Sequence, residues 1–400
     1  MTFEKTYIDQ IKEDFANMQD VSDLAVVLSK ARNILYDKEC KPFNSETLYY
    51  FAYPQNCKHR FKEFSIKKKS GAIRTIHSPT RELKSILRAL NFVFQCIFTP
   101  HSAATGFVPK KSIVDNAKKH TGKHYVLNMD MKDFFYSFDR NRVKMGFLAE
   151  PFNLKGTKEP IAFLIACLCT HPVEIGSEII HVLPQGSPCS PIVTNILCAR
   201  LDRRLKGLAN RHGVVYSRYA DDITFSSLHN AFNREAEPVI GEKGHYNNFI
   251  AEFERLIGQE KLNINHKKTR LQKSGYCQEA TGLIVNEKVN VRRRYVKQLR
   301  MWLYYWEKYG YEKAEQIFKR DYITDKGHVK NINAHLVNVL DGKLEFLKMV
   351  KGAEDGTYKG LKERFDILVG FTDPINQILN AWQTEGIDQA MSIYYKDKLE

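Results

Sequence analysis

Two adjacent aspartates are the residues whose types and spacing point most directly to chemistry. They end the run Tyr219-Ala220-Asp221-Asp222, which lies between two short alternating stretches that predict strands. Neighbouring carboxylates at a tight turn repel one another, and a bound Mg²⁺ would relieve that repulsion with the hard oxygen ligands it prefers. The alternative is an exposed Asp-Asp turn without a ligand, because aspartate favours turns.

A third aspartate, Asp130, would complete a site for two metal ions. It follows residues 125–129, a largely apolar stretch that predicts a strand ending near the Asp221-Asp222 turn. In such sites two ions stabilise the attacking and leaving oxygens of phosphoryl transfer. The alternative role for Asp130 is to cap the turn after its strand.

A rigid loop precedes a predicted helix. Residues 183–191 include three prolines, one glycine and two serines. Gln185 and the backbone N–H groups of this loop are expected to contact a sugar or a base at the helix N-terminus. Taken alone, the segment is equally compatible with an ordinary loop and helix start.

The composition favours a folded protein with a polyanionic partner. The chain has 400 residues, 43% of them hydrophobic, which is enough for two or three packed subdomains and excludes global disorder. The formal net charge of +15 favours nucleic acid as the partner over a protein that is merely basic. The eight cysteines form no C-x-x-C pair, so we expect buried thiols in a reducing cytosol.

We expect a cytoplasmic protein without a membrane partner. The N-terminus lacks a basic-then-apolar signal pattern, and the longest strongly apolar run, residues 161–169, is too short to cross a bilayer.

Hydrophobic periodicity predicts the elements that position these residues. Helices are expected over residues 5–35, 78–90, 188–205, 291–309, 332–349 and 358–368, with N-caps at Ser22-Asp23 and Ser78. Strands are expected over residues 61–66, 73–76, 125–130, 214–218 and 223–226, the first two forming a hairpin with a basic tip. On the helix from residue 291, one apolar face carries Tyr295, Leu299, Trp302, Leu303 and Trp306, and Gly310 ends it.

In this order and spacing, the motifs resemble the palm of reverse transcriptases. Asp130 begins the first palm motif, residues 183–191 form the next, and residues 219–222 are the Y-x-D-D box. Residues 262–269, with Lys268, resemble the following motif, and residues 281–285 resemble the primer grip. The resemblance covers roughly residues 45–300.

Within that superfamily the chain looks most like bacterial retron reverse transcriptases. Residues 116–120 match the retron N-A-x-x-H element, and residues 79–84 resemble the retron fingers. Ala280-Thr281-Gly282 stands where retrons usually have V-T-G.

The resemblance implies site residues. Asp130, Asp221 and Asp222 would be catalytic and bind two Mg²⁺ ions, with Mn²⁺ as a substitute. Phe135 would be the steric gate that favours dNTPs, unless it is a core aromatic, a role that better suits Phe134 or Phe138. The residues expected to contact the nucleotide are Arg74, Lys68, Lys69, Phe135, Gln185, Tyr219 and Lys268.

Alternatives stay open for several of these roles. Lys68 and Lys69 would otherwise be a solvated hairpin tip, and Lys268 would either protonate the leaving group or only screen charge. Asn116 and His120 would serve RNA recognition or structural support. The residues expected to bind RNA or DNA are Asn116, His120, Arg292, Arg293, Arg294, Lys297 and Arg300.

The expected fold is α+β, a right-hand polymerase with fingers, a palm of antiparallel sheet plus helices, and a helical thumb. The expected domains are residues 1–115 (N-terminal helices and fingers), 116–290 (palm with interleaved fingers elements) and 291–400 (thumb and C-terminal extension).

The resemblance implies a nucleotidyltransferase of the retron type. It would reverse transcribe a cognate structured noncoding RNA (msr-msd) from a guanosine 2′-OH, using dNTPs, to make branched msDNA. It would act in anti-phage defence with an effector or toxin protein encoded nearby. The alternatives are another defence-associated reverse transcriptase without msDNA and a catalytically silent nucleic-acid-binding protein.

Overall fold

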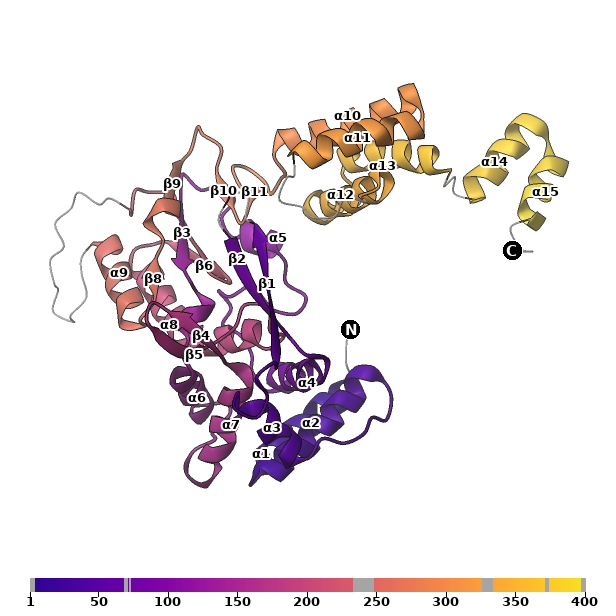
Figure 1. Cartoon of the computed structure of the whole chain (residues 1–400). Coiled ribbons are helices and arrows are strands. Elements are labelled where there is room, and N and C mark those ends of the chain that lie inside the picture. Colours follow the sequence, from indigo (N-terminus) through magenta and orange to yellow (C-terminus); the bar gives the residue numbers. More distant parts are fainter. Residues whose placement is uncertain are drawn as a thin grey trace. The chain divides into compact units, whose positions relative to one another are not determined.

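A computed structural model describes residues 4–67, 71, 73–232, 248–325, 334–370 and 374–396. The chain divides into two compact units, an N-terminal unit (Met1–Lys288) and a C-terminal unit (Val289–Glu400), which are described separately (Figure 1). The predicted domain boundaries at residues 115 and 290 stay predictions.

Four helices form the first layer of the N-terminal unit: α1 (Lys5–Asn17), α2 (Val21–Tyr36), α3 (Ser45–Ala52) and α4 (Arg81–Ile97). Helix α2 is capped by Asp20, whose side chain accepts from the backbone N–H of Ser22 and of Asp23, so the predicted cap at Ser22-Asp23 was two residues late. The predicted cap at Ser78 was also wrong, because the preceding strand continues to Pro79 and α4 begins after Thr80.

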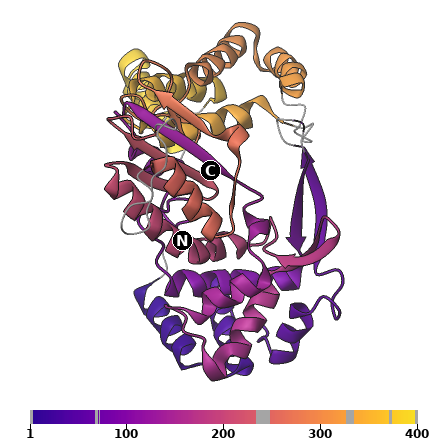
Figure 2. The same cartoon turned by 90° about the vertical axis from the view of Figure 1, so that its left-hand side faces the viewer.

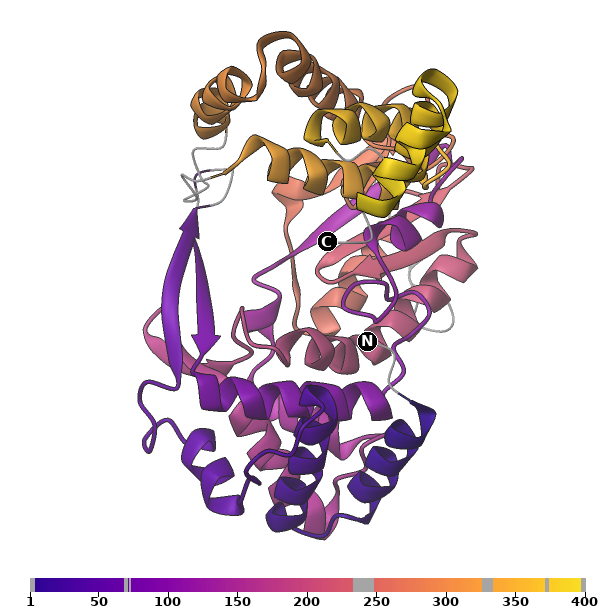
Figure 3. The same cartoon turned by 90° about the vertical axis from the view of Figure 1, so that its right-hand side faces the viewer.

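The strand before α4 belongs to a long antiparallel hairpin, as predicted. Strands β1 (Phe61–Lys67) and β2 (Ile73–Pro79) pair along their whole length. Figures 2 and 3 show, from opposite sides, this hairpin projecting from the helical layer. Lys68 and Lys69, which the sequence predicts at the hairpin tip, lie outside the described residues.

The central sheet of this unit is antiparallel and has β3 (Tyr125–Lys132) at its centre. On one side β3 pairs with β7 (Asp222–Ser227), which pairs with β6 (Val215–Tyr219). On the other side it pairs with β8 (Asn263–Ile264) and β9 (Arg270–Lys273). The predicted strands over 125–130, 214–218 and 223–226 are therefore confirmed within two residues at each end.

Helices α8 (Ser190–Arg211) and α9 (Phe249–Gln259) pack against this sheet and against each other. The ring of Phe225 on β7 lies 4.9 Å from that of Phe249 and 5.6 Å from that of Phe253, both on α9. The rest of the unit comprises α5 (Ile113–Lys118), α6 (Arg140–Leu148), α7 (Glu159–Cys169), β4 (His171–Ile175), β5 (Glu178–Val182), β10 (Glu279–Ala280) and β11 (Leu283–Ile284).

The described part of the C-terminal unit is helical, as expected. It comprises α10 (Arg293–Tyr309), α11 (Tyr311–Asp325), α12 (Leu336–Lys351), α13 (Gly356–Val369), α14 (Pro374–Glu385) and α15 (Ile387–Lys396). The predicted apolar face of α10 is buried at Leu299, Trp302, Leu303 and Trp306. Trp302 meets Phe318 of α11 and Trp306 meets Phe365 of α13 edge-on.

Gly310 ends α10 with φ +76°, a conformation that suits glycine. Within the described residues, no helix combines the length and the apolar character that crossing a bilayer requires. The α+β class is confirmed.

Candidate active site

The sheet brings the three aspartates of the predicted site together. Asp130 on β3 lies directly opposite Asp222 on β7, and Asp221 occupies the turn before β7. The turn also touches β3, because the backbone N–H of Met131 donates to the carbonyl oxygen of Asp221 at 3.2 Å. Ala220 has φ +58°, as the first central residue of a two-residue hairpin turn requires.

The three carboxylates act on one another electrostatically. Burial raises the pKa of Asp222 to about 6, and the charges of Asp221 and Asp130 contribute. Burial also raises the pKa of Asp221, and Asp130 adds to that rise, while Lys268 and Arg74 oppose it. Burial is thus the main cause of the raised pKa values, and repulsion among the carboxylates adds to it.

Lys268 is the nearest cation to Asp130. Its Nζ lies 2.9 Å from Oδ1 and 3.0 Å from Oδ2 of that carboxylate. Asn265 donates to the same group, from Nδ2 to Oδ2 at 3.0 Å, and its backbone N–H donates to the Asp130 carbonyl at 2.8 Å. Asn265 and Lys268, both in the motif over residues 262–269, thus hold Asp130 from the edge of β3 that pairs with β8 and not from the edge that pairs with β7.

The donor chemistry of this site fits a divalent cation. Carboxylate oxygens are the ligands that Mg²⁺ prefers, and a cation would lower the part of the pKa rise that comes from repulsion among the aspartates. The ammonium of Lys268 already occupies a cation's position against Asp130. Within the described part of the chain, no three His, Cys, Asp or Glu side chains are arranged to hold an ion, so binding would require these side chains to turn toward one another.

A cavity of about 370 Å³ opens beside Asp130 and Asp222. Lys267, Lys268 and Arg270 line it, together with Thr281 and Gly282 of the segment predicted to be retron-like. Cationic side chains and carboxylates therefore line the same cavity. The cations suit a phosphate chain, and the carboxylates suit metal ions.

Two of the predicted nucleotide contacts, Arg74 and Tyr219, lie near the turn, and a third, Gln185, lies against β2. The backbone N–H of His77 on β2 donates to the carbonyl of Gln185 at 2.8 Å. Gly186 has φ +116°, and a Cβ there would lie 2.8 Å from the His77 carbonyl oxygen, so the 183–191 loop presses against β2. Arg74, also on β2, is near enough to lower the pKa of Asp221, and Tyr219 pairs with Asp222 across the β6–β7 hairpin.

Phe135 is half-buried, whereas Phe134 and Phe138 are buried in the core, as expected for those two. The centre of the Phe135 ring lies 5.8 Å from that of Phe134 and 6.2 Å from that of Phe107. The steric-gate role of Phe135 stays a prediction.

Asn116 and His120 lie in the interior and have no exposed surface. His120 Nδ1 is 2.7 Å from Oγ of Ser226 and its Nε2 is 2.6 Å from Oγ of Ser217, which ties the segment after α5 to β6 and β7. Asn116 Oδ1 accepts from the Thr105 hydroxyl at 2.8 Å. These contacts do not suit direct RNA recognition, and they favour the alternative of structural support.

The sequence did not predict a buried network that holds the turn. Arg218 donates twice to Asp202 of α8, and its Nη1 donates to the Ala220 carbonyl at 3.1 Å. Nη2 also donates to Oδ1 of Asn195 at 3.1 Å. The sequence signal that could have revealed this network was Asp202, a charged residue on the apolar stripe of a helix.

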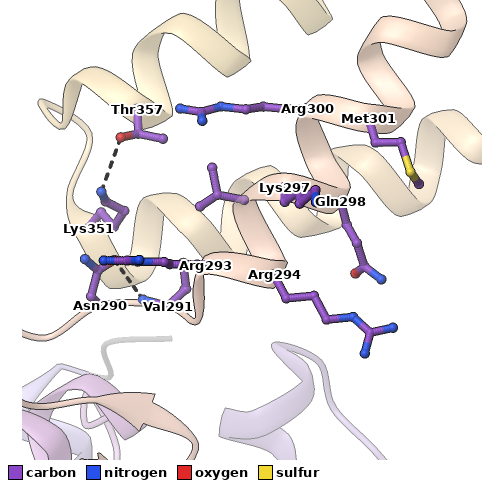
Figure 4. A pocket seen from close by; sticks show the side chains of 11 residues that line it. Asn290, Val291, Arg293, Arg294, Lys297, Gln298, Arg300, Met301, Lys351 and Thr357 are labelled. Carbon is purple, nitrogen blue, oxygen red and sulfur yellow. Dashed lines mark hydrogen bonds between the residues drawn. The ribbon is translucent and has the colours of Figure 1, made fainter. Parts of the chain in front are cut away.

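In the C-terminal unit, a cavity of about 920 Å³ collects predicted nucleic-acid contacts (Figure 4). Arg293, Arg294, Lys297 and Arg300 of α10 line it, and Lys351 lies across from them. In Figure 4 the Arg300 side chain extends toward Thr357, and Lys351 donates to Oγ1 of Thr357 at 3.3 Å. Arg292 caps α10 and does not line the cavity.

The family to which this site belongs follows from comparison with known proteins. A family model described as reverse transcriptase (RNA-dependent DNA polymerase) matches residues 66–295, more than half of the chain. The chain belongs to this reverse transcriptase family. The relatives that match it include retron reverse transcriptases from bacteria.

Three of these relatives give the extent of the similarity. The Mx65 retron reverse transcriptase of Myxococcus xanthus is 31% identical over 307 residues, 74% of this chain and 63% of that protein. The Mx162 enzyme of the same organism is 36% identical over 253 residues, 60% of this chain and 51% of that protein. The Ec86 enzyme of Escherichia coli is 32% identical over 260 residues, 64% of this chain and 72% of that protein.

The chain thus spans between half and two thirds of the length of the two Myxococcus relatives. Among solved structures, telomerase from Candida albicans in complex with a telomeric RNA fragment has a TM-score of 0.41 and 12% identity, covering 81% of this chain and 66% of that one. A similarity at that level carries no argument about this chain.

Proposed function

We propose that this chain is an RNA-directed DNA polymerase of the retron type. One observation carries the proposal: Asp130 faces Asp222 across the sheet, with Asp221 at the adjoining turn, inside the segment that matches the family. Reverse transcriptases generally use divalent ions, and we propose two Mg²⁺ ions, replaceable by Mn²⁺, held by Asp130, Asp221 and Asp222. When bound, the ions would activate the primer hydroxyl and neutralise the charge of the departing pyrophosphate.

The residues around the turn would bind the incoming dNTP. Arg74 is suited to bidentate contact with a triphosphate, and Lys68 and Lys69 would add point charges. Gln185 and Tyr219 would flank the nucleotide and the primer end, and Phe135 would exclude a ribose 2′-OH. Lys268 would release Asp130 and screen the charge of the phosphates.

The basic side chains that line the cavity of α10 would contact the backbone of the template–product duplex. Phosphate contacts from Arg293, Arg294, Lys297 and Arg300, with Arg292 beside them, would position the duplex without reading its sequence. Asn116 and His120 would support the retron-specific part of the site from within.

The relatives support a more specific proposal. The template would be a cognate structured noncoding RNA (msr-msd), the primer a guanosine 2′-OH within it, and the product branched msDNA. The complex would act in anti-phage defence with an effector protein encoded nearby.

The test is to express the chain with its flanking genomic DNA and to extract small nucleic acids. The extract is treated with RNase and with debranching enzyme, and its DNA is resolved on a gel. The inactive variant is Asp221→Asn/Asp222→Asn. The matched control is Asp133→Asn, since Asp133 is an exposed aspartate whose positive φ asparagine tolerates.

We expect a discrete DNA in the wild type and in the Asp133 variant. It should change mobility on debranching and be missing from the double variant. DNA that depends on the aspartates but has no branch would support another defence reverse transcriptase. DNA of equal amount in all three strains would overturn polymerase activity and favour a silent nucleic-acid-binding protein.

A further inference from the structure

The segment before Phe107 is pressed against the catalytic turn. The backbone N–H of Thr105 donates to the Arg218 carbonyl at 2.8 Å, and Asn195 Nδ2 donates to the Gly106 carbonyl at 3.0 Å. A Cβ on Gly106 would lie 2.4 Å from the backbone N of Ala220, so only glycine permits this approach. The position of the next residue, Phe107, is therefore fixed relative to the turn.

Phe107 combines an uncommon backbone conformation with a partly exposed ring. Its φ is +60°, which is rare for a bulky side chain, and 37% of its surface is exposed. Strained backbone of this kind persists where the surroundings determine it, and it concentrates at functional sites. Neither property serves the core of the N-terminal unit.

The ring of Phe107 meets the ring of Phe135. Their centres are 6.2 Å apart with the planes inclined at 46°, while Phe134 contacts Phe135 at 5.8 Å and 68°. Phe135 is thus in contact with one buried ring, that of Phe134, and one partly exposed ring, that of Phe107. A phenylalanine held by two rings has fewer accessible rotamers than one held only by the core.

We propose that Phe107 is a positioning residue for sugar selection: it holds the Phe135 ring in the orientation that excludes a ribose 2′-OH. The inference rests on the proposed function, because it requires Phe135 to meet the sugar. Phe107 acts through Phe135 and is not itself required for nucleotide addition. Thr105 links this support to the retron-like element, because its hydroxyl donates to the buried Asn116.

The test measures discrimination rather than activity alone. The full-length protein extends a DNA primer on an RNA template by one nucleotide, with dCTP or with CTP, and the ratio of the two kcat/KM values is the readout. The variants are Phe107→Ala, Phe107→Tyr, Phe135→Ala and Lys110→Ala. Lys110 is the matched control, because it lies in the same loop, is exposed and also has positive φ.

We expect Phe107→Ala to lower the dCTP-to-CTP ratio roughly three- to tenfold, the worth of one aromatic pair. Phe135→Ala should lower it further, and Phe107→Tyr and Lys110→Ala should keep the wild-type ratio. An unchanged ratio in Phe107→Ala, with a lowered ratio in Phe135→Ala, would overturn the inference and leave the proposed function intact.

An unchanged ratio in both alanine variants would overturn the steric-gate role and this inference together, while DNA synthesis itself would stand. Should Phe107→Ala fail to fold, as judged by its circular dichroism, Phe107→Leu carries the same test. It keeps bulk but loses the ring, so its ratio should still fall below that of Phe107→Tyr, and an equal ratio would count against the inference.

Discussion

The guanidinium of Arg218 holds the carboxylate of Asp202 at two points, Nε to Oδ1 at 2.8 Å and Nη2 to Oδ2 at 2.6 Å. Both side chains are fully buried, and the same guanidinium donates to the carbonyl of Ala220 in the turn that precedes Asp221 and Asp222. A helix and a hairpin are thereby joined beside the two aspartates for which we propose a catalytic role.

Removing one partner of this pair should be costly. Arg218→Met leaves Asp202 buried without its counter-charge, and we expect it to lower the free energy of unfolding by about 3–5 kcal/mol. The double variant Arg218→Met/Asp202→Leu should recover part of that loss. Urea unfolding followed by circular dichroism measures both effects.

The control for this pair is Arg364→Met. It breaks a partly exposed bidentate pair with Glu307 and should cost no more than about 1 kcal/mol. All three tryptophans lie in the C-terminal unit, so their fluorescence reports separately on that unit. A cost in Arg218→Met no larger than that of the control would contradict the prediction.

Gly106→Ala should disable the turn. The new Cβ would meet the backbone N of Ala220 at 2.4 Å, so the segment or the turn must move, at a cost of about 1–3 kcal/mol. We expect DNA synthesis to fall more than tenfold per folded molecule. Gly207→Ala on α8 meets nothing within 4 Å and should stabilise the protein by up to ~1 kcal/mol. Full activity in Gly106→Ala would show that the turn tolerates displacement.

The free energy of unfolding should depend on His120 at acidic pH. Burial, aided by the charges of Lys119 and Lys123, lowers the pKa of His120 to about 3 in the folded state, against about 6.5 when unfolded. The unfolded chain binds the extra proton between these values. Stability contributed by neutral His120 is therefore present above pH 6.5 and lost as the pH falls toward 3.

His120→Gln should remove about 1.4 kcal/mol per pH unit from the slope of unfolding free energy against pH within that window. Burial lowers the pKa of His171 to about 3 as well, so replacing both residues should double the change. His59→Gln, at an exposed position, is the control. Equal slopes for His120→Gln and wild type would argue against this assignment.

Lys268 should compete with the metal for Asp130. The pair is largely exposed on the lysine side, so its removal should lower the Mg²⁺ concentration that half-saturates DNA synthesis by only about two- to fivefold. Lys268→Gln tests this, with Lys267→Gln as the neighbouring control. A higher Mg²⁺ requirement in Lys268→Gln would mean that the lysine assists metal binding instead.

The basic cavity of α10 predicts a salt dependence. If Lys297 and Arg300 each contact a phosphate, alanine at either position should reduce the slope of log binding constant against log salt by about 0.9. Fluorescence anisotropy with an RNA–DNA hybrid provides the measurement. Lys359→Ala, a basic residue of α13 outside the cavity, should leave the slope unchanged. A change at Lys359 as large as at Arg300 would indicate diffuse attraction rather than defined contacts.

The central strands and the Asp-Asp turn could be predicted because their signals are local: alternation, a turn sequence and the spacing of carboxylates. Helix caps were harder, because several polar residues compete within one turn, and Asp20 prevailed over Ser22. The β4–β5 hairpin was not predicted, since Pro172 inside β4 argues against a strand.

The burial of several polar side chains depends on tertiary contacts, which hydrophobic periodicity does not reveal. Nothing local shows that Arg218 would be paired within the core, or that Asn116 and His120 would face inward rather than toward RNA. For the same reason, the sequence does not predict the contact between Phe107 and Phe135.

The strand order also has a consequence for synthesis on the ribosome. β3 is the first strand of its sheet to be made, yet its neighbours β7 and β9 lie about 90 and 140 residues further along the chain. A growing chain therefore carries a central strand with both edges open until β7 emerges, and with one edge open until β8 and β9 follow, a state prone to mispairing. The three aspartates of the proposed active site cannot come together before β7 has been translated, and Lys268 and Asn265 join them only later.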